Sequence, residues 1–532
     1  MKALASLQPF LVFATFTFLG FTIACGGGSG TSDPAPHTYI QPTANPLVAQ
    51  FIVDSPCPGQ AMVEFGPDTS YGRTTPWYAV APMFSNARTL QQTKILVAGM
   101  RASTTYHMRS QIQCTGGNAS ATPDLTFTTG PLPSLPFPTL TVTRPSPSTT
   151  SRENPGIEMI DVIAPGTPAY FTDRDANPIW YYDVGAGNYA FPFKFLPNGH
   201  ILVSILAPTD STLREIDLIG NTIGGINVGA LNTKLEAAGY NFKITSFHHD
   251  ILPLANGHII ALAQHYEPFT NLPGYPGTIS VAGDVLIDLD QNWDPVWVWD
   301  TFDHLDINRH LNGLPDWTHG NALVYSPADG NILFSMRHQS WVIKIDYNNG
   351  AGTGNIIWKL GYQGDFAFTQ DGIPSDDPSL WFSFQHFPTL VSQNGSQTTL
   401  AIWDNGDNRV LNEDGELCLQ APPGGATPSC YSRATLFQLD ESAMVANLLW
   451  ADPLVYFGVW GGSINQLGND NVEFDLNAPL VPPNAGVASE VQEVTQTSTP
   501  QIVWKMDITP LTATAYRAYR VPSLYPGVSW QY

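Results

Sequence analysis

Positive charge is scarce in this sequence. Of its 532 residues only 22 are Lys or Arg, against 45 Asp or Glu, and the formal net charge is −23. Nucleic acids require basic surfaces, so this composition argues against nucleic acid as a partner. It does not exclude a small anionic ligand, because a few cations focused in one pocket can outweigh the overall charge.

Long helical patterns are also missing beyond the N-terminus, and charged residues make up only 13% of the chain. Glycine and proline are instead abundant, with 46 and 45 residues. Such a composition favours short strands joined by turns over helical bundles. We therefore predict an all-β protein, long enough for two domains or for one large repeat fold.

Cysteine is rare, with five residues, and the first of them follows a predicted export signal. Lys2 precedes a long apolar region, and Cys25 is followed by a Gly/Ser run. This pattern is typical of a bacterial lipoprotein signal, although Thr22 is a poor match to the aliphatic residue usual three positions before the cysteine. We predict a signal peptide over 1–25, then a flexible linker over 26–37. Lipidation at Cys25, with plain secretion as the alternative, would place the protein in the periplasm or on the outer membrane.

The other cysteines are Cys57, Cys114, Cys418 and Cys430. An even number in an exported chain suggests disulfides. Three pairings are possible. The favoured one joins Cys57 to Cys114 in the N-terminal part and Cys418 to Cys430 within one loop. No CxxC pair is present, which argues against a structural zinc site.

Two parts of the chain differ in pattern. Residues 38–130 alternate apolar and polar residues between turn signals, as in a small β-sandwich. The stretch "LVAGMRASTTYHMR" resembles the late strands of fibronectin type III domains, with Tyr106 at the position of their corner tyrosine. A Pro-rich segment over 131–157 is predicted to be a stiff linker or an extended strap, and 158–532 to be a second domain.

Residues 158–532 repeat two short units. An apolar pair followed by tryptophan recurs in "NPIWYYD", "DPVWVWD", "NIIWKLG", "NLLWADP" and "QIVWKMD", with a degenerate copy near "NTIGGINV". Asn-Gly or Asp-Gly turns recur in "LPNGHILVS", "LANGHIIAL" and "PADGNILFS", where both central residues are expected to have positive φ. Six four-stranded units predict a six-bladed β-propeller; a parallel β-helix would have shorter, more regular repeats. Segment 516–525 is expected to close the propeller by pairing near 158–183.

Three consecutive units begin their innermost strand with histidine. His249, His319 and His386 lie eight, eleven and nine residues before the glycine of a hairpin turn. The innermost strands of a propeller line its channel, so these residues are expected to converge at one mouth. A lone histidine is more often structural, but three at equivalent positions of adjacent repeats favour a shared function.

Asn321 and Arg337 are expected to join these histidines. Asn321 lies two residues after His319, which in a strand places both on one face. Arg337 follows the turn of the same unit in apolar company, where an arginine usually has an anionic partner. Such a donor-rich pocket suits a tetrahedral oxyanion, and an imidazole can also be a nucleophile. Three histidines could instead hold zinc or copper, but the fixed charge of Arg337 argues against a metal.

Taken together, the motifs around these residues resemble those of one known protein family. "FHHD", "THGN…SMRHQSWVIKID" and "FQHFP", with the tail "YRAYRVPSLYP", look like the bacterial arylsulfotransferases over about residues 158–532. The resemblance implies transfer of a sulfuryl group from an aryl sulfate ester to a phenolic acceptor, without nucleotide or other cofactor. It also implies a ping-pong mechanism through a sulfohistidine.

The resemblance also assigns roles by position. His386 would be the nucleophile, and His319, Asn321 and Arg337 would bind sulfuryl oxygens. Attack requires a neutral imidazole, and Arg337 is expected to lower the pKa of His386. A histidine of "FHHD" would serve as acid and base at the phenolic oxygen.

The histidine of "FHHD" that reaches the channel stays open. Adjacent residues of a strand point to opposite faces, so only one of His248 and His249 should face the site. His249 is favoured because it directly precedes Asp250 and fits the hairpin register better. The family also has a disulfide near the site, to which the Cys418–Cys430 loop is similar.

Two rival functions remain. A non-catalytic propeller lipoprotein for adhesion or ligand binding would use the histidines only as anion ligands. A metal-dependent propeller hydrolase would need carboxylates at the channel, and Asp250 is the only obvious candidate. The physiological donor and acceptor, membrane contact through a lipid at Cys25, and a homodimer are left open by the sequence.

Overall fold

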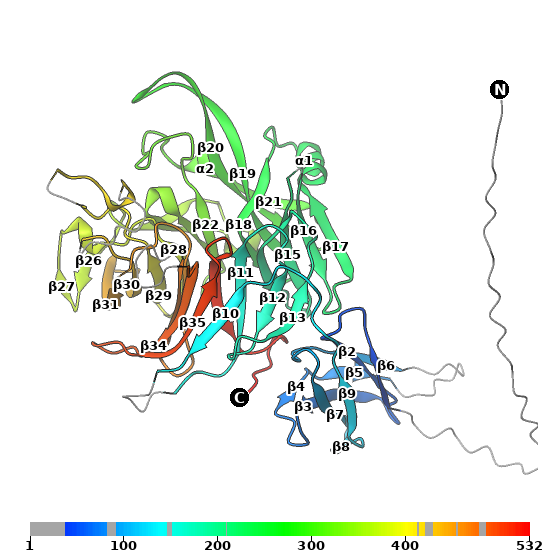
Figure 1. Ribbon diagram of the computed structural model, residues 1–532. Coiled ribbons are helices and arrows are strands. Elements are labelled where there is room, and N and C mark those ends of the chain that lie inside the picture. The colour runs from blue at the N-terminus through cyan, green and yellow to red at the C-terminus, as the bar shows by residue number, and fades with distance from the viewer. Residues whose placement is uncertain are drawn as a thin grey trace, which may run out of the picture.

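The structure is a computed structural model that describes residues 38–81, 92–145, 152–208, 210–411, 414–420, 429–453, 456–477 and 486–531. It is mostly β, with a small N-terminal part beside a larger array of sheets (Figure 1). The predicted signal peptide, the lipidation site Cys25 and the linker over 26–37 lie outside the described residues. Within the described ranges, no helix combines the length and apolar character needed to cross a membrane.

The N-terminal part consists of two antiparallel sheets. The first contains β1 (Tyr39–Pro42), β2 (Ala49–Val53) and β6 (Thr93–Val97). The second contains β3 (Gly59–Gly66), β4 (Arg73–Thr74), β5 (Tyr78–Val80), β7 (Thr105–Cys114), β8 (Ala119–Ala121) and β9 (Leu125–Thr128). Alternate side chains of β7 are buried, as expected for a strand with one face on a core. The backbone N–H of Arg101 donates to the hydroxyl of Tyr106 at 2.9 Å, and Cys57 is bonded to Cys114.

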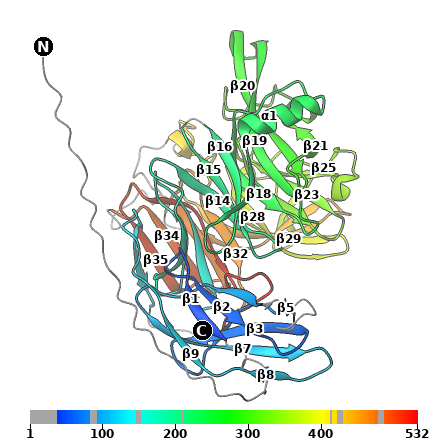
Figure 2. The same ribbon diagram turned by 90° about the vertical axis from the view of Figure 1, so that its right-hand side faces the viewer.

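Six further sheets, each built on four antiparallel strands, form the larger part (Figures 1 and 2). The first three contain β36 (Thr514–Val521), β11 (Ile157–Ile163), β12 (Ala169–Thr172) and β13 (Pro178–Tyr182); β14 (Tyr189–Phe195), β15 (Ile201–Leu206), β16 (Ser211–Ile216) and β17 (Thr222–Asn227); and β18 (Ser246–Pro253), β19 (Ile259–Leu272), β20 (Tyr275–Leu289) and β21 (Pro295–Asp300). The last three contain β22 (Gly320–Ser326), β23 (Asn331–Met336), β24 (Trp341–Ile345) and β25 (Ile356–Leu360); β28 (His386–Asn394), β29 (Gln397–Asp404), β30 (Arg433–Asp440) and β31 (Val445–Pro453); and β32 (Ser463–Gln466), β33 (Val472–Asn477), β34 (Ser489–Val494) and β35 (Ile502–Thr509).

A few shorter elements decorate these sheets. They are the strands β26 (Ala367–Gln370) and β27 (Ile373–Pro374), the helices α1 (Val228–Ala237) and α2 (Thr301–His304), and the 3-10 turns η1 (Arg337–Gln339), η2 (Asn348–Gly350), η3 (Pro378–Leu380) and η4 (Cys418–Gln420). β26 runs parallel to β31 and extends the fifth sheet. The long β19–β20 hairpin projects beyond the other sheets (Figure 2).

The predicted repeat is confirmed. Each tryptophan unit lies in the fourth strand of a sheet, and the degenerate copy is β17. The expected hairpin turns were wrong in detail. Only the glycine has a positive φ, 86° at Gly199 and 84° at Gly257. The N–H of Gly199 donates to the carbonyl of Leu196, and that of Leu196 to His200. These are three-residue loops, in which a turn is followed by one left-handed glycine.

The predicted closing pairing is also confirmed. β36 pairs antiparallel with β11, and Glu158 lies opposite Arg520. Part of the segment predicted as a linker is a strand, β10 (Thr139–Thr143), which pairs with β35 and adds a fifth strand to the last sheet. The free edge of β35 offers backbone groups that an extended Pro-rich segment can satisfy.

Neighbouring sheets meet through their first strands, and the first sheet also meets β14 through its second strand, β11. β14 packs against β11, β18 against β14, β22 against β18, β28 against β22, β32 against β28, and β36 against β32 and β33. The histidine-bearing strands β18, β22 and β28 are therefore consecutive neighbours.

The tail after β36 joins the two parts of the protein. The indole N–H of Trp530 donates to the carbonyl of Thr74 at 2.9 Å, and its ring meets Phe65 edge-on at 5.8 Å. The hydroxyl of Tyr525 donates to the carbonyl of Leu96. Because both rings are buried, the core of the N-terminal part is continuous with that of the first two sheets.

We predict that Trp530→Ala uncouples the two parts. Truncating a fully buried tryptophan costs about 3–5 kcal/mol. Differential scanning calorimetry should show the transition of the N-terminal part moving to lower temperature, away from that of the six sheets. Trp77→Ala, at a tryptophan 39% exposed, is the control and should leave the scan unchanged. Equal shifts for the two variants would contradict this coupling.

Candidate active site

The three predicted histidines lie where their strands lose regular pairing. The register shifts between Phe247 and Ile251 in β18, after Gly320 in β22 and after His386 in β28. Three residues at these points have left-handed backbones, with φ of 50° at His249, 49° at His319 and 41° at Phe387. A left-handed non-glycine residue costs about 1–2 kcal/mol. Bulges bend a strand and re-aim its side chains, and such strain is typical of functional sites.

The bulges bring the histidines together, as predicted. The ring of His249 lies 4.7 Å from that of His319. Tyr516, on β36, has its ring 5.5 Å from His249 and 5.6 Å from His386. Its hydroxyl is buried without a partner among the described residues. The group therefore draws on β18, β22, β28 and the closing strand.

The hydrogen bonds of His386 fix its tautomer. Nδ1 lies 2.7 Å from Oδ1 of Asn405, and the amide nitrogen of Asn405 donates to the carbonyls of Gly458 and Gly461. Oδ1 of Asn405 is thus the acceptor, and Nδ1 of His386 carries the proton. The N–H of Gly461 donates to Nε2 at 3.2 Å, so Nε2 holds a lone pair. Burial, and then the charge of Arg337, lower the pKa of His386 well below its usual value.

The two histidines of "FHHD" both approach the site, which corrects the expectation that only one could. The bulge ends the alternation of side chains, and Nδ1 of His248 lies 2.8 Å from Nδ1 of His249. His249 contacts His319 and Tyr516, whereas Nε2 of His248 lies 3.1 Å from a carboxylate oxygen of Asp284. Among the described residues Nε2 of His248 makes no hydrogen bond there, and the short contact between the two Nδ1 atoms requires that one of the two rings donates to the other.

His319 is held by a carboxylate. Its Nδ1 lies 2.6 Å from Oδ2 of Asp316. Burial raises the pKa of Asp316, but the hydrogen bond from His319 and the charges of the neighbouring histidines together outweigh this and hold the pKa below its usual value. No partner is recorded for Nε2 of His319 among the described residues. This nitrogen is left for a ligand.

His338 was assigned no role from the sequence, yet it lies 4.6 Å from His319, ring to ring. With Asp316 and His319 it forms a group whose ligand atoms lie within 4.8 Å of one another, as a metal site requires. Both of its nitrogens are already used: Nε2 accepts from Arg337 at 2.7 Å and Nδ1 donates to the carbonyl of Asp316 at 2.8 Å. The residues therefore fit a hydrogen-bond network better than a metal centre.

Arg337 begins η1, directly beside these histidines. One terminal nitrogen donates to Asp407 at 3.2 Å and to the carbonyl of Val459 at 3.0 Å, and Nε is buried without a partner in the described structure. Burial raises the pKa of Asp407 well above its usual value.

The N–H of Leu419, in the loop of the Cys418–Cys430 disulfide, donates to the carbonyl of Asp407. Both disulfides follow the favoured pairing.

Asn321 is fully buried, and it links two of the strands. Its amide nitrogen donates to the carbonyl of Gln385 at 2.7 Å, immediately before His386. Its Oδ1 is buried and has no partner among the described residues. One amide hydrogen remains for a ligand.

Arg517 on β36 holds together the strands that carry the site. Its guanidinium is fully buried and donates to Asp250 at 3.1 Å, to the carbonyl of Asn321 at 3.0 Å and to that of His249 at 3.3 Å. It also lies 4.0 Å from the centre of the Phe387 ring. The sequence reasoning missed this residue, although the rule applied to Arg337, that an arginine in apolar company needs an anionic partner, applies equally to "YRAYR".

Comparison with known proteins was made at three levels. The family model described as Arylsulfotransferase (ASST) matches residues 161–520. No curated protein matches the sequence. Among solved structures, hydrazine synthase of Kuenenia stuttgartiensis is 12% identical with a TM-score of 0.24, covering 60% of this chain and 79% of the other. Dihydro-heme d1 dehydrogenase NirN in complex with DHE is 12% identical with a TM-score of 0.28, covering 71% and 80%. Likenesses this slight do not bear on the fold or the activity.

We predict that His338 makes stability depend on pH. Burial and the neighbouring His319 lower its pKa to about 4. Below pH 6.5 the unfolded chain therefore takes up a proton that the folded one does not, so the free energy of unfolding falls as pH decreases. The full effect is about 3 kcal/mol. We expect the free energy of unfolding, measured with urea at pH values between 4 and 7, to change less with pH in His338→Gln than in the unsubstituted protein. Parallel slopes would show that this imidazole is not the one that titrates.

Proposed function

The chain belongs to the arylsulfotransferase family, and from this premise we propose that it moves a sulfuryl group from an aryl sulfate ester to a phenol through a sulfohistidine at His386. The observation that carries the proposal is the buried, neutral imidazole of His386, with its proton on Nδ1 and its lone pair on Nε2. A neutral imidazole is the form that can attack sulfur.

In the first half-reaction, Nε2 of His386 attacks the sulfur in line with the leaving phenolic oxygen. The N–S bond forms as the S–O bond to the aryl group breaks. The sulfuryl oxygens lie against Arg337, whose Nε is free to donate, and against His319, whose Nδ1 is held by Asp316. The hydrogen bond from Nδ1 to Asn405 stabilises the positive charge that develops on the sulfurylated ring.

We propose that His249 is the base that accepts the proton of the acceptor phenol. Burial, followed by the charges of His319 and His248, lowers the pKa of His249 well below the usual value, so its ring is neutral and can take up a proton. In the second half-reaction this ring takes the proton of the acceptor phenol as the phenolic oxygen attacks sulfur and the N–S bond breaks. In the first half-reaction the leaving phenolate takes its proton from solvent, and the proton that His249 gains in the second passes to solvent. The ring of Tyr516, stacked at 6.5 Å on the exposed Trp460, offers a surface for the aryl group.

We further propose that the six sheets close into a six-bladed β-propeller preceded by a fibronectin III-like sandwich. The packing of β36 against β32 and β33, and its pairing with β11, support closure. The hydrogen bond from Arg101 to Tyr106 supports the sandwich assignment. The two disulfides support export to the periplasm or the outer membrane. We propose that a lipid at Cys25 then attaches the protein to the membrane.

The metal-dependent alternative has less support. Asp250, its candidate carboxylate, is taken by Arg517 at 3.1 Å, by Lys194 at 2.6 Å and by the N–H of Leu323. With His338 also committed, few groups remain to hold a cation.

The proposal predicts nucleotide-free transfer. With 4-nitrophenyl sulfate and phenol, in the presence of chelator, the protein should release nitrophenolate continuously and form phenyl sulfate. Without phenol, release should stop after about one equivalent per protein. His386→Ala should lower the rate by about 10³-fold or more, because the covalent route is lost. His107→Ala, in the N-terminal part, is the control and should transfer normally. Release that continues past one equivalent per protein without phenol, loss of transfer with chelator, or turnover by His386→Ala would each contradict the mechanism.

A second prediction concerns Arg517 as a positioning residue. Arg517→Lys keeps a positive charge beside Asp250 but cannot reach both backbone carbonyls, so the histidine strands shift. Displacing reacting groups by about 1 Å can lower the rate by about 10²-fold. We therefore expect kcat to fall by about that factor while KM changes little. Arg520→Lys is the matched control. Arg520 is equally buried on β36, but it pairs with Glu158, Glu473 and Glu493. If both variants lose kcat equally, Arg517 has only a structural role.

A further inference from the structure

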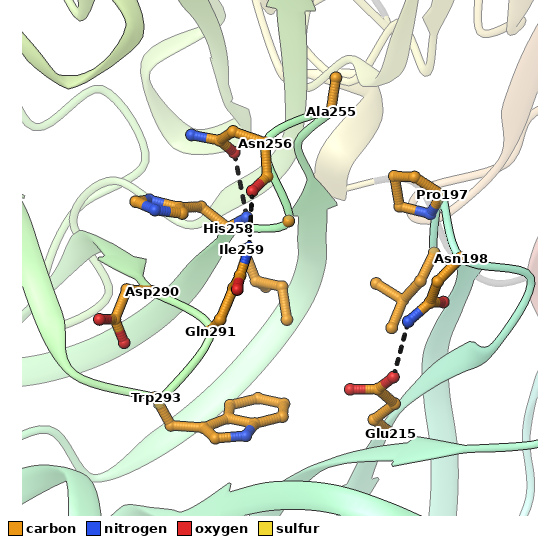
Figure 3. Close-up of a pocket in the computed structure, with 12 residues that line it drawn as sticks. Pro197, Asn198, Glu215, Ala255, Asn256, His258, Ile259, Asp290, Gln291 and Trp293 are labelled. Carbon is orange, nitrogen blue, oxygen red and sulfur yellow. Dashed lines mark hydrogen bonds between the residues drawn. The ribbon is translucent and has the colours of Figure 1, made fainter.

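A second cavity lies at the far end of the third sheet from the histidines. It has a volume of about 550 Å³ and opens between the second and third sheets (Figure 3). The turns after β14, β18 and β20 form its walls. His249 lies in β18 and Ala255 lies two residues beyond its end, so six residues of mostly extended chain place the cavity up to about 20 Å from the reacting groups. The proposed transfer reaction does not use it.

Trp293, at the base of this cavity, occupies an unusual backbone position. The first three sheets share one turn between their third and fourth strands. In each, the N–H of the fourth turn residue donates to the carbonyl of an aspartate three residues earlier: Ala176 to Asp173, Gly220 to Asp217, and Trp293 to Asp290. These residues have φ of 64°, 98° and 62°. Glycine adopts such a backbone freely, alanine is uncommon there, and a bulky residue is an outlier. Strain of this kind persists where a side chain is needed for function.

The indole of Trp293 also differs from the buried tryptophans. Trp180, Trp299 and Trp504 each donate their ring N–H to a backbone carbonyl. Trp293 is only half-buried, and no partner is recorded for its Nε1 among the described residues. Its ring lies against Gly224, where a Cβ atom would come within 3.2 Å of Nε1. One face and one donor are thus left for a ligand.

Polar side chains surround the indole with spare hydrogen-bonding capacity. Figure 3 shows Asn198 and Glu215 on one side of the opening, and His258, Gln291 and Asp290 on the other. One oxygen of Glu215 accepts from Asn198 and lies 2.5 Å from Nδ1 of His200. Nδ1 of His258 pairs with Asp288, and the amide nitrogen of Gln291 donates to the carbonyl of Asn256. The other oxygen of Glu215, Nε2 of His258 and the oxygen of Gln291 have no recorded partner among the described residues.

The chemistry of the lining selects an uncharged ligand. Neither lysine nor arginine lines the cavity, and two carboxylates do, so an aryl sulfate or another anion would be repelled. A cationic ligand is less suited, because Glu215 already faces His200, Asp290 is capped by the N–H groups of Asn292 and Asp294, and only one aromatic ring is present. A flat apolar face beside mixed donors and acceptors matches a sugar ring, whose C–H face is apolar and whose hydroxyls both donate and accept.

We propose that this cavity is a carbohydrate-binding site for a neutral saccharide of one or two rings, with Trp293 stacking on the sugar. Its volume is in the range of small-ligand pockets. The ring would lie on the indole, with hydroxyls bonded to Glu215, His258 and Gln291. The site is separate from the histidine cluster and does not depend on the proposed transfer.

The test is saturation-transfer difference NMR on the full chain. The probes are glucose, galactose, mannose, N-acetylglucosamine, maltose, cellobiose and lactose, each titrated to 50 mM, with tetramethylammonium as the cationic probe. At least one sugar should bind, and Trp293→Gly should weaken it tenfold or more. This variant suits the left-handed turn, so loss of binding would not reflect unfolding. Val296→Ala, on the same hairpin at 52% exposure, should bind normally.

Several outcomes would overturn the inference: no sugar binds, Trp293→Gly binds as well as the unsubstituted protein, or tetramethylammonium binds here in preference to every sugar. His386→Ala should bind the sugar normally, and Trp293→Gly should transfer sulfuryl groups normally, so failure of one proposal is distinguishable from failure of the other.

Discussion

The buried ion pair between Arg517 and Asp250 holds the centre of the protein. Lys194 of β14 joins it at 2.6 Å, and Asp250 also accepts the N–H of Leu323 on β22. Arg517 belongs to β36, Asp250 to β18, and the guanidinium stacks on Phe387 of β28. One cluster therefore touches five of the six sheets. Such a pair stabilises only when its remaining hydrogen-bonding capacity is used, and the carbonyls of His249 and Asn321 use it here. The same contacts set the backbone from which the site is built.

The site is assembled from departures from regular structure. His249, His319 and Phe387 each take a left-handed conformation at a bulge, and burial lowers the pKa values of His249 and His386 well below the usual value. These features cost stability. The antiparallel sheets, the buried fourth-strand tryptophans and the central ion pair offset that cost. The rigid frame thus carries a strained and partly unsatisfied pocket, as the free Nε of Arg337 and hydroxyl of Tyr516 show.

Much of this architecture could be predicted because it follows from periodic signals. The tryptophan units lie in fourth strands, and the tail pairs with β11. The spacing of His249, His319 and His386 from the following turn glycine places them at the same end of their strands. What could not be predicted depends on breaks in periodicity. The alternation rule assigned His248 and His249 to opposite faces, and a bulge removed the alternation. The partners of the site come from distant loops with no repeat to reveal them. Asn405 lies 19 residues from His386, and Gly461 lies 75.

Because β36 follows all the other sheets in the chain, the pairing that completes the first sheet is among the most distant in sequence. Arg520 and Glu158, which meet across it, are 362 residues apart. Folding that depends on such remote contacts is slow, and β11 presents an open edge until the contact forms. A chain cut short before β36 would contain all three histidines and yet lack Tyr516 and Arg517. The proposed transfer is thereby tied to completeness: fragments left by interrupted synthesis or by a protease carry the three histidines but not the strand that positions them.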